Sequence, residues 1–173
     1  MNTTEWLKRD HELILDALDV LAITAKWAQA GGVVPEQHMR KLIAFFREFA
    51  DDYHHQKEEQ VLFPALLAAG MPRQGPVAVM LREHDMGRDL LRRIEVSLPE
   101  LDVEAALDYV DLLSLHIRKE NEILFYMADR LLEGCDQQLL AQMLTKTENA
   151  VPQIFGQDDY RRNFAEIQQA CSE

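Results

Sequence analysis

Two stretches of the sequence repeat one another, and each places a histidine four residues before a glutamate. The first, HHQKEEQVLFP, begins at His54, and the second, HIRKENEILFY, begins at His116. Aligned without a gap on their Leu-Phe pairs, they match these two histidines and also match Glu58 with Glu120. Residues four apart are neighbours on one face of a helix. Each stretch therefore predicts a helix that directs an imidazole and a carboxylate to the same point, as one wall of a metal site.

The composition is that of a mostly helical globular protein. Of the 173 residues, 47% are hydrophobic and 28% are charged, with only 7 Gly and 6 Pro, which suits one domain with a sizeable core. The net charge of −12 disfavours nucleic acid and anionic membranes as partners. No apolar run approaches the roughly 18 residues of a membrane-spanning helix, and the polar N-terminal stretch lacks a signal-peptide profile. The expected compartment is the cytoplasm.

The two cysteines form no recognisable metal or disulfide motif. Cys135 and Cys171 lie far apart, and neither is near a histidine in the sequence. A zinc-finger or CxxC site is excluded, and a disulfide framework is not expected. Any metal site in this chain must use nitrogen and oxygen ligands.

Glycine and proline residues divide the chain into four long amphipathic segments. The predicted helices cover residues 4–30, 35–64, 76–98 and 103–132, with apolar residues at helical spacing in each. Because the connections are short, neighbouring helices should be antiparallel. We expect an all-α fold, an up-down-up-down antiparallel four-helix bundle over residues 1–134.

The remaining residues, 135–173, have a weaker helical pattern. Residues 136–148 and 158–171 are predicted helices, with Pro152 between them. This segment carries no histidine. We expect a short helical C-terminal extension that packs on the bundle.

Each of the four long helices carries one histidine on or beside its apolar stripe. These histidines are His11, His54, His84 and His116. Burying four imidazoles and two carboxylates without partners would be severely destabilising. A metal centre removes that cost, because neutral imidazoles and ionised carboxylates are its ligands.

Six such ligands can serve two metal ions evenly. Each ion would take two histidines, and Glu58 and Glu120 would bridge the pair, which leaves positions for a bridging oxygen species and a small ligand. Imidazole and carboxylate ligands without sulfur suit iron or manganese, and zinc is also possible.

Each element of this pattern also has an ordinary interpretation. A single helical histidine is more often a core or surface residue, and a single His–Glu pair is usually a surface ion pair. Lys57 and Lys119 are expected to be solvated or paired with nearby carboxylates. His38 lies on the far side of its helix from His54 and is expected at the surface. Four inward histidines, one per helix, together with the repeat favour the metal site.

The adjacent histidines of the first stretch are separated by helical geometry. At about 100° per residue, His54 borders the apolar stripe of its helix. His55 shares its side with Glu48, Asp52 and Glu59, which is a solvated face. The predicted ligand is therefore His54, and His55 and Glu59 are expected to point outward or to support the ligands.

These residues resemble a known family. The two repeated stretches, DHELIL around His11 and EHDMGRDL around His84 look like the haemerythrin-like, HHE cation-binding domain family, over about residues 5–130. The resemblance implies a four-helix bundle with two iron ions in a non-haem di-iron centre that is oxo- or hydroxo-bridged. The ligands it implies are His11, His54, Glu58, His84, His116 and Glu120.

The sequence departs from the oxygen-carrying haemerythrins at two points. Those carriers have two histidines four apart in the third helix, whereas the residues four either side of His84 are Met80 and Arg88. They also place an aspartate five residues after the last histidine, whereas Glu120 lies four after His116. One histidine fewer implies more open coordination, which favours the divergent members of the family over carriers. The residues that remain open as an extra ligand or supporting donor are His55, Glu59, Tyr53 and Tyr109.

The sequence therefore leaves three functions open. The first is a metal-binding protein that binds or senses a small ligand such as O2 or NO, or handles iron. The alternative is a di-iron peroxidase- or catalase-like enzyme that acts on H2O2, in which Tyr109 could supply electrons or protons. The third is a domain whose metal only holds the helices together. Without a nucleophilic triad or a Gly-rich phosphate loop, hydrolase and nucleotide chemistry are not expected.

Overall fold

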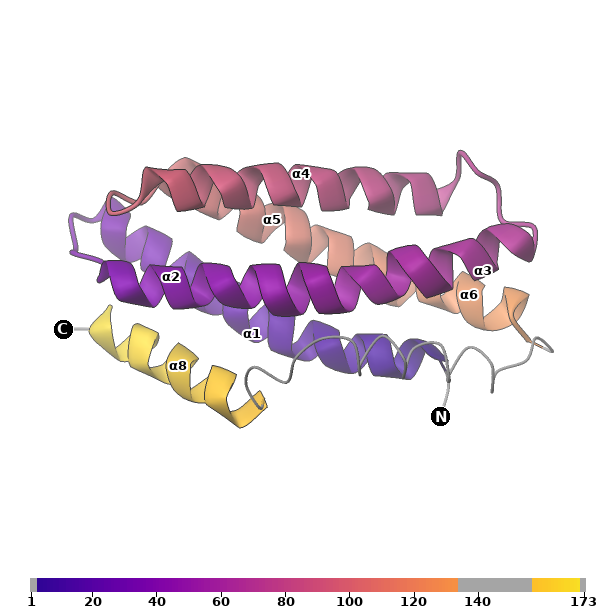
Figure 1. Ribbon diagram of the computed structural model, residues 1–173, viewed down its shortest axis with the longest axis horizontal. Coiled ribbons are helices and arrows are strands. Elements are labelled where there is room, and N and C mark those ends of the chain that lie inside the picture. Colours follow the sequence, from indigo (N-terminus) through magenta and orange to yellow (C-terminus); the bar gives the residue numbers. More distant parts are fainter. Residues whose placement is uncertain (1–2, 134–156, 172–173) are drawn as a thin grey trace.

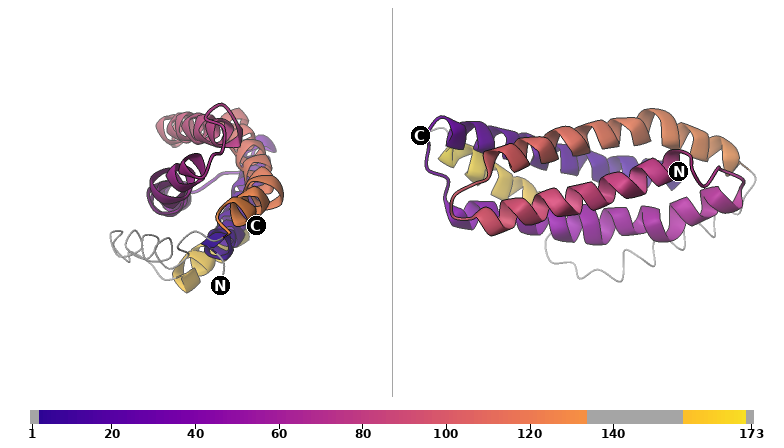
Figure 2. Two further views of the ribbon diagram at one scale, coloured as in Figure 1. Left: turned by 90° about the vertical axis from the view of Figure 1, so that its right-hand side faces the viewer. Right: turned by 90° about the horizontal axis from the view of Figure 1, so that it is seen from above.

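The computed structural model describes residues 3–133 and 157–171, and every regular element within these ranges is helical. The all-α class predicted from the sequence is confirmed for this part of the chain. Within it, four helical rods lie side by side along the long axis of the molecule, with short loops joining them at its ends (Figure 1, Figure 2).

Two of the rods are single α-helices, and two combine α-helical with π-helical segments. The first rod is α1 (Thr3–Gln29), and the third is α4 (Pro76–Ser97). The second contains α2 (Glu36–Phe45), η1 (Phe46–His55), η2 (Glu58–Leu62) and α3 (Phe63–Ala68). The fourth contains α5 (Val103–Lys119), η3 (Glu120–Leu124) and α6 (Phe125–Leu131). Pro64 does not end the second rod: it lies in the first turn of α3, directly after the π-helical segment η2, and the helix continues to Ala68.

Local sequence signals end the rods at the expected places. Asp102 caps α5 by accepting a hydrogen bond from the backbone N–H of Ala105 at 2.9 Å, as N-cap residues do. Gly31 and Gly70 follow α1 and α3 with φ of 88° and 100°, a left-handed conformation that glycine adopts without strain. The chain can therefore reverse direction within a few residues.

π-helical turns occur at both repeated stretches. Glu58 begins η2, and Glu120 begins η3. The backbone oxygen of each glutamate accepts a hydrogen bond from the N–H of the phenylalanine five residues later, Phe63 or Phe125. The repeat in the sequence is thus also a repeat in the backbone. Such turns within α-helices are frequent at functional sites.

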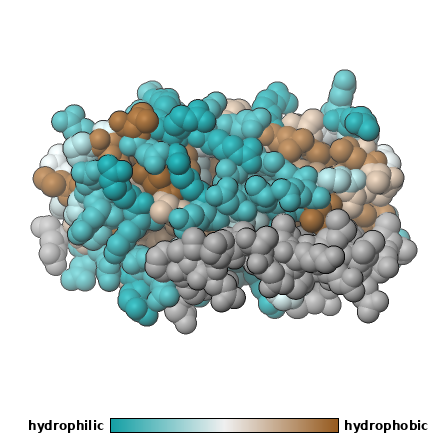
Figure 3. All heavy atoms as spheres, viewed as in Figure 1, coloured by the Kyte–Doolittle hydropathy of each residue, from teal (hydrophilic) through white to brown (hydrophobic). Residues whose placement is uncertain are grey.

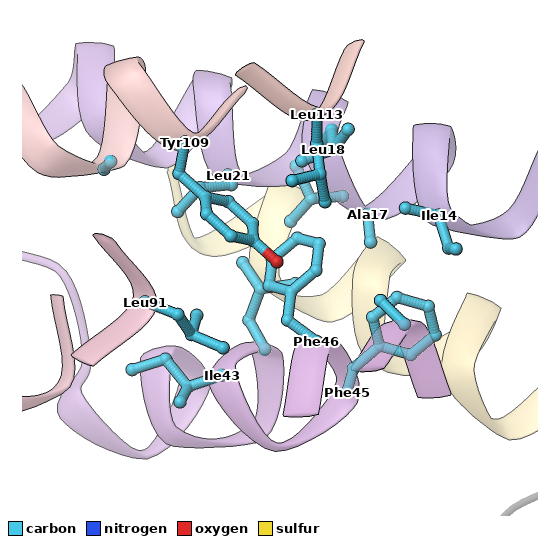
Figure 4. Packing of buried hydrophobic residues seen from close by; sticks show 14 of the residues in the cluster. Ile14, Ala17, Leu18, Leu21, Ile43, Phe45, Phe46, Leu91, Tyr109 and Leu113 are labelled. Atoms are coloured by element: carbon cyan, nitrogen blue, oxygen red, sulfur yellow. The ribbon is translucent and has the colours of Figure 1, made fainter. Parts of the chain in front are cut away.

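Two apolar clusters fill the interior. The larger draws on α1, α2, η1, α4, α5 and the last described helix. Figure 4 shows its centre, where Phe46 and Tyr109 pack edge to face with centroids 5.0 Å apart. The smaller contains residues such as Leu7, Leu66 and Phe125. Along each rod, the predicted ligand lies between residues of the two clusters. The six predicted ligands therefore form a polar layer between two apolar ones.

Gly87, which interrupts the inner face of α4, has a packing role. A Cβ at this position would lie 3.3 Å from Leu113 Cδ1 and 3.7 Å from Tyr109 Cε2. The glycine therefore lets α4 approach α5 closely, near the level of His84.

The last described helix, α8 (Gln157–Ala170), packs against α1 and α2 (Figure 1). The rings of Tyr160 and Phe164 meet the ring of Phe45 edge to face, with centroids 4.8 Å and 5.1 Å away. The helix predicted at 136–148 lies outside the described residues. The division of the chain at residue 134 stays a prediction.

Polar side chains cover much of one face of the described residues, beside smaller hydrophobic patches (Figure 3). This face is in line with the net charge of −12. None of the helices within residues 3–133 and 157–171 has the length and apolar character that crossing a membrane requires.

Candidate metal centre

The structure brings the six predicted ligands together in the polar layer. The side chains come from all four rods, and each is at most 1% exposed: His11, His54, Glu58, His84, His116 and Glu120. This burial of four imidazoles and two carboxylates is the arrangement that the sequence predicts for a metal site.

The four imidazoles form two pairs. His11 Nε2 lies 2.9 Å from His54 Nε2, and His84 Nε2 lies 3.2 Å from His116 Nε2. Two nitrogens this close can both lie about 2.1 Å from one ion, the usual zinc–imidazole bond length. Each pair can therefore supply two ligands to its own ion.

The two carboxylates lie between the histidine pairs. Glu120 Oε2 is 3.2 Å from His11 Nε2 and 3.3 Å from His116 Nε2. Glu58 Oε1 is 3.6 Å from His54 Nε2, and its Oε2 is 3.5 Å from His84 Nε2. Each carboxylate thus touches one histidine of each pair, and the ligand atoms form two sets of four that share both glutamates.

The carboxylate oxygens are the atoms that indicate a cation. All four oxygens of Glu58 and Glu120 are buried, and none has a hydrogen bond. The nearby imidazole nitrogens are close enough to attract them but are not aligned to donate. An unsatisfied buried carboxylate is costly, and metal ions between the glutamates and the imidazoles would satisfy these oxygens. The residues present therefore fit a two-metal centre.

The Nδ1 nitrogens of His54 and His116, which point away from the centre, each donate a hydrogen bond to a carboxylate. His54 Nδ1–H donates to Asp10 Oδ2 at 3.3 Å, and His116 Nδ1–H donates to Glu83 Oε2 at 3.0 Å. These two acids directly precede His11 and His84 in the sequence. An ionised carboxylate only accepts hydrogen bonds, so the proton lies on Nδ1 and Nε2 faces the centre.

The Nδ1 nitrogens of the other two histidines, which point away from the centre, also have matching hydrogen-bond partners. His11 Nδ1–H donates to Asn121 Oδ1 at 2.8 Å, and His84 Nδ1–H donates to Glu59 Oε1 at 2.7 Å. Asn121 and Glu59 directly follow the two buried glutamates. Metal-bound histidines usually donate their second N–H to such an oxygen, which fixes the ring and makes it a better ligand.

The lysines of the repeat support two of these acids. Lys57 Nζ donates to Asp10 Oδ2 at 3.1 Å, and Lys119 Nζ donates to Glu83. Of the two outcomes considered from the sequence, pairing with a carboxylate is the one observed. Lys57 is also only 1% exposed, so its ion pair with Asp10 is part of the interior.

The prediction that His55 lies on a solvated face is wrong. Its side chain is buried, and its ring stacks on the ring of His84 with centroids 3.8 Å apart. The reason is the π-helical segment η1, which has more residues per turn than an α-helix. Each residue then turns through less than the assumed angle, and His54 and His55 both reach the interior.

An ion-pair network lies outside His55 and His84. His55 Nδ1–H donates to Asp51 Oδ1 at 3.3 Å, and Arg88 donates to Asp51 and to Glu59, each at 2.7 Å. Glu59 therefore supports His84 rather than facing solvent alone. Asp51 and Arg88 also line a surface depression of about 360 Å³, and none of the six predicted ligands is among its lining residues.

The two tyrosines that the sequence left open have other neighbours. The ring of Tyr53 lies 3.5 Å from Lys57 Nζ. Tyr109 is buried in the larger apolar cluster, against Phe46.

Comparison with known proteins agrees with this geometry. The family model for the Hemerythrin HHE cation binding domain matches residues 2–128. The chain belongs to the hemerythrin HHE cation-binding family. No curated protein and no solved structure shows a significant match. Metal-cation binding follows from membership of this family together with the two ligand sets.

Sequence reasoning missed several residues of this hemerythrin-like site, namely the outer partners of the histidines. Asp10, Glu83 and Asn121 were not predicted, although a signal for the first two is visible. An acid precedes the ligand histidine in both α1 and α4, so these two helices also carry matching dipeptides.

Burial and charge act in opposite directions on the imidazoles of the metal-free centre. Burial alone would lower the pKa of His116, but Glu120 and Glu83 raise it to about 10. The pKa values of His11 and His84 are also raised, because Glu120 and Glu58 outweigh the effect of burial. Burial and the neighbouring His84 instead lower the pKa of His55. Protons therefore balance the buried carboxylates when no metal is bound.

Metal uptake by the metal-free protein should release protons at neutral pH and become tighter as the pH rises. Metal ions bind neutral imidazole, so the protons on His11, His84 and His116 must leave. The raised pKa of His116 also makes the stability of the metal-free protein depend on pH. Its contribution to stability is complete below pH 6.5, the pKa of the unfolded state, and is lost as the pH rises through about 10, the pKa in the folded state. Calorimetry in buffers of different ionisation enthalpy will measure the proton release. A metal-free Tm that does not fall across this range would contradict the expectation.

Proposed function

We propose that this chain is a non-haem di-iron protein, built on an up-down-up-down four-helix bundle, that binds or senses a small ligand such as O2 or NO, or handles iron. One observation carries the proposal. The four buried oxygens of Glu58 and Glu120 have no hydrogen bond, and each carboxylate lies between imidazoles of both histidine pairs.

The ligand chemistry favours iron. Each ion would have two imidazoles and a share in two carboxylates, and no sulfur ligand lies in either set. Nitrogen and oxygen ligands of this kind, with coordination positions left open, are typical of non-haem iron. Manganese and zinc accept similar ligands, so metal analysis must decide among them.

The position of the centre favours a small ligand. The ligand layer lies between two apolar clusters, and the ligand side chains are at most 1% exposed. Two iron ions held here would supply open coordination positions for O2 or NO. The protein residues themselves hold the imidazole rings, keep the protons on Nδ1 and exclude bulk water from the layer.

The first test is metal content and the optical spectrum. Protein produced with iron in the medium should contain about two irons per chain, and oxidised protein should show near-UV bands from oxygen-to-iron charge transfer. Anaerobic addition of NO to the reduced protein should then give a stable spectral change. Zinc, or the absence of metal after growth with iron, would contradict the proposal.

Peroxide is the second candidate, because α5 carries a buried phenol, Tyr109, about two helical turns before His116. Burial, with the nearby charge of Asp51, raises the pKa of this phenol above its usual value. The phenol therefore stays protonated and can give up a hydrogen atom. Steady O2 evolution, or steady oxidation of an added donor after addition of H2O2, would identify an enzyme. A single stable spectral change would identify a binding protein. Tyr109→Phe should slow donor oxidation without changing the iron content.

A further inference from the structure

The hydrogen bonds outside the ligand layer treat two of the four histidines alike. His54 donates to Asp10, and His116 donates to Glu83. A lysine of the repeat donates to each of these acids. An acid and a lysine side by side carry no net charge, so these contacts do not distinguish one half of the layer from the other.

The other two histidines differ in the charge of their partners. His84 Nδ1–H donates to the carboxylate of Glu59 at 2.7 Å, whereas His11 Nδ1–H donates to the neutral amide oxygen of Asn121 at 2.8 Å. The gapless alignment of the repeat places Glu59 opposite Asn121. Because the two distances are nearly equal, these partners differ in charge and not in how closely they hold the ring.

A guanidinium holds Glu59 in place. Arg88 Nη2 donates at 2.7 Å to Glu59 Oε1, the oxygen that also accepts from His84. A cation beside a carboxylate favours its ionised form. Arg88 lies four residues after His84, whereas Leu15 lies four residues after His11. The charged partner and the residue that supports it therefore occur in the same half of the layer.

Arg88 does not cancel the negative charge in this half, because it serves more than one carboxylate. Its Nε also donates to both oxygens of Asp51 at 3.0 Å, and the alignment places Asp51 opposite Leu113. A further partner, Asp85, is 77% exposed and is solvated. Two carboxylates and one guanidinium thus leave a negative charge beside His84, while the matching residues of the other half are neutral.

A negative charge on the outer partner changes the imidazole that it contacts. It makes the ring a stronger electron donor to a bound ion. The His84 ring is only 1% exposed, and charges interact more strongly in such an interior than in water. Fe(III) carries one positive charge more than Fe(II), so the higher oxidation state gains more from this partner.

We infer that Glu59 is a positioning residue that acts through His84 and lowers the reduction potential of the iron held by His84 and His116. The inference rests on the proposed two-iron centre and concerns the order in which its ions react. When a one-electron oxidant is added to the Fe(II)–Fe(II) form, the first electron leaves this iron. The second electron then leaves the iron held by His11 and His54.

The test is a stepwise oxidation of the reduced, fully loaded protein with a one-electron oxidant, followed by optical and Mössbauer spectra. Glu59→Gln keeps the length of the side chain and an oxygen that accepts from His84, but it removes the charge. Changing the outer partner of a ligand histidine alters metal affinity by roughly 10- to 100-fold. Because the hydrogen bond is kept, we expect the lower potential to rise by about 59 mV, which is a tenfold change for a one-electron couple. The higher potential should change much less.

Asn121→Asp is the matched variant in the other half. It adds a carboxylate of the same size beside His11 and should lower the higher potential by a similar amount. Both variants therefore narrow the gap between the two oxidation steps, from opposite sides. Glu122→Gln removes an exposed charge next to Asn121 and should leave both potentials unchanged.

The outcomes separate this inference from the two-iron centre itself. Wild-type protein that holds fewer than two irons would overturn the centre. Two irons with unaltered potentials in Glu59→Gln would mean that Glu59 only holds the ring, since glutamine keeps that hydrogen bond. A rise in the higher potential instead of the lower one would overturn its assignment to the first iron oxidised. If Glu59→Gln does not load with iron, Asn121→Asp decides, and an unchanged higher potential there would overturn the role of the outer charge.

Discussion

Replacing Glu120 with glutamine should weaken the binding of both metal ions. The carboxylate lies 3.2 Å from His11 Nε2 and 3.3 Å from His116 Nε2, so it serves both positions at once. Removing even an outer partner of a metal ligand costs roughly 10- to 100-fold in affinity, and we expect about 100-fold or more at each position. Iron analysis after purification should show almost no metal. Glu58→Gln should behave in the same way.

Two comparisons make this result specific to shared carboxylates. His11→Ala should lower the affinity of one ion far more than that of the other, because its nitrogen belongs to one ligand set only. Glu122→Gln changes an exposed glutamate two residues away and should have no effect. The metal-free form of Glu120→Gln should remain folded, since it no longer buries a charge. Loss of a single ion in Glu120→Gln would show that the carboxylate does not bridge.

Replacing Lys57 with methionine should destabilise the metal-free protein by about 3 kcal/mol, because breaking a buried ion pair leaves a buried charge without its partner. The side chains of Lys57 and Asp10 are only 2% and 8% exposed. Burial would raise the pKa of Asp10, but His54 and Lys57 lower it, so the carboxylate stays ionised. Urea unfolding will measure the loss.

Lys119 is the matched control for this prediction. It makes the equivalent ion pair with Glu83, but these side chains are 28% and 14% exposed. Water can replace the lost partner there, so Lys119→Met should cost about 1 kcal/mol or less. Adding Asp10→Asn to Lys57→Met should recover part of the stability, since it removes the unpaired charge. Equal losses for the two lysine variants would contradict the role of burial.

The ligand layer could be predicted from the sequence because two independent patterns select it. The repeat identifies the histidine and glutamate of the second and fourth rods. Helical spacing of apolar residues places His11 and His84 on inward faces, and the Gly and Pro breaks give the rods. Each of these signals depends on residues within one helix, where sequence distance sets spatial distance.

The remaining features depend on contacts between helices or on local backbone geometry. Asp10 and Glu83 support histidines of other rods, and spacing along one helix does not show this. The α-helical angle per residue places His55 on the wrong face, because η1 is π-helical and turns through a smaller angle at each residue. The direction of a side chain next to a ligand can therefore be inferred only when the backbone conformation of its helix is known.

The ligand layer also determines how the two ends of the chain depend on each other. Residues 3–68 form one helical hairpin, and residues 76–131 form another. Glu120 of the second hairpin reaches His11 of the first, and Glu58 of the first reaches His84 of the second. Metal bound to both ligand sets would thus cross-link the two hairpins reversibly, and neither hairpin could detach without disrupting both metal positions. The loaded protein should unfold as one unit, while in the metal-free chain the two hairpins are joined mainly by the apolar clusters on either side of the layer and should separate more easily.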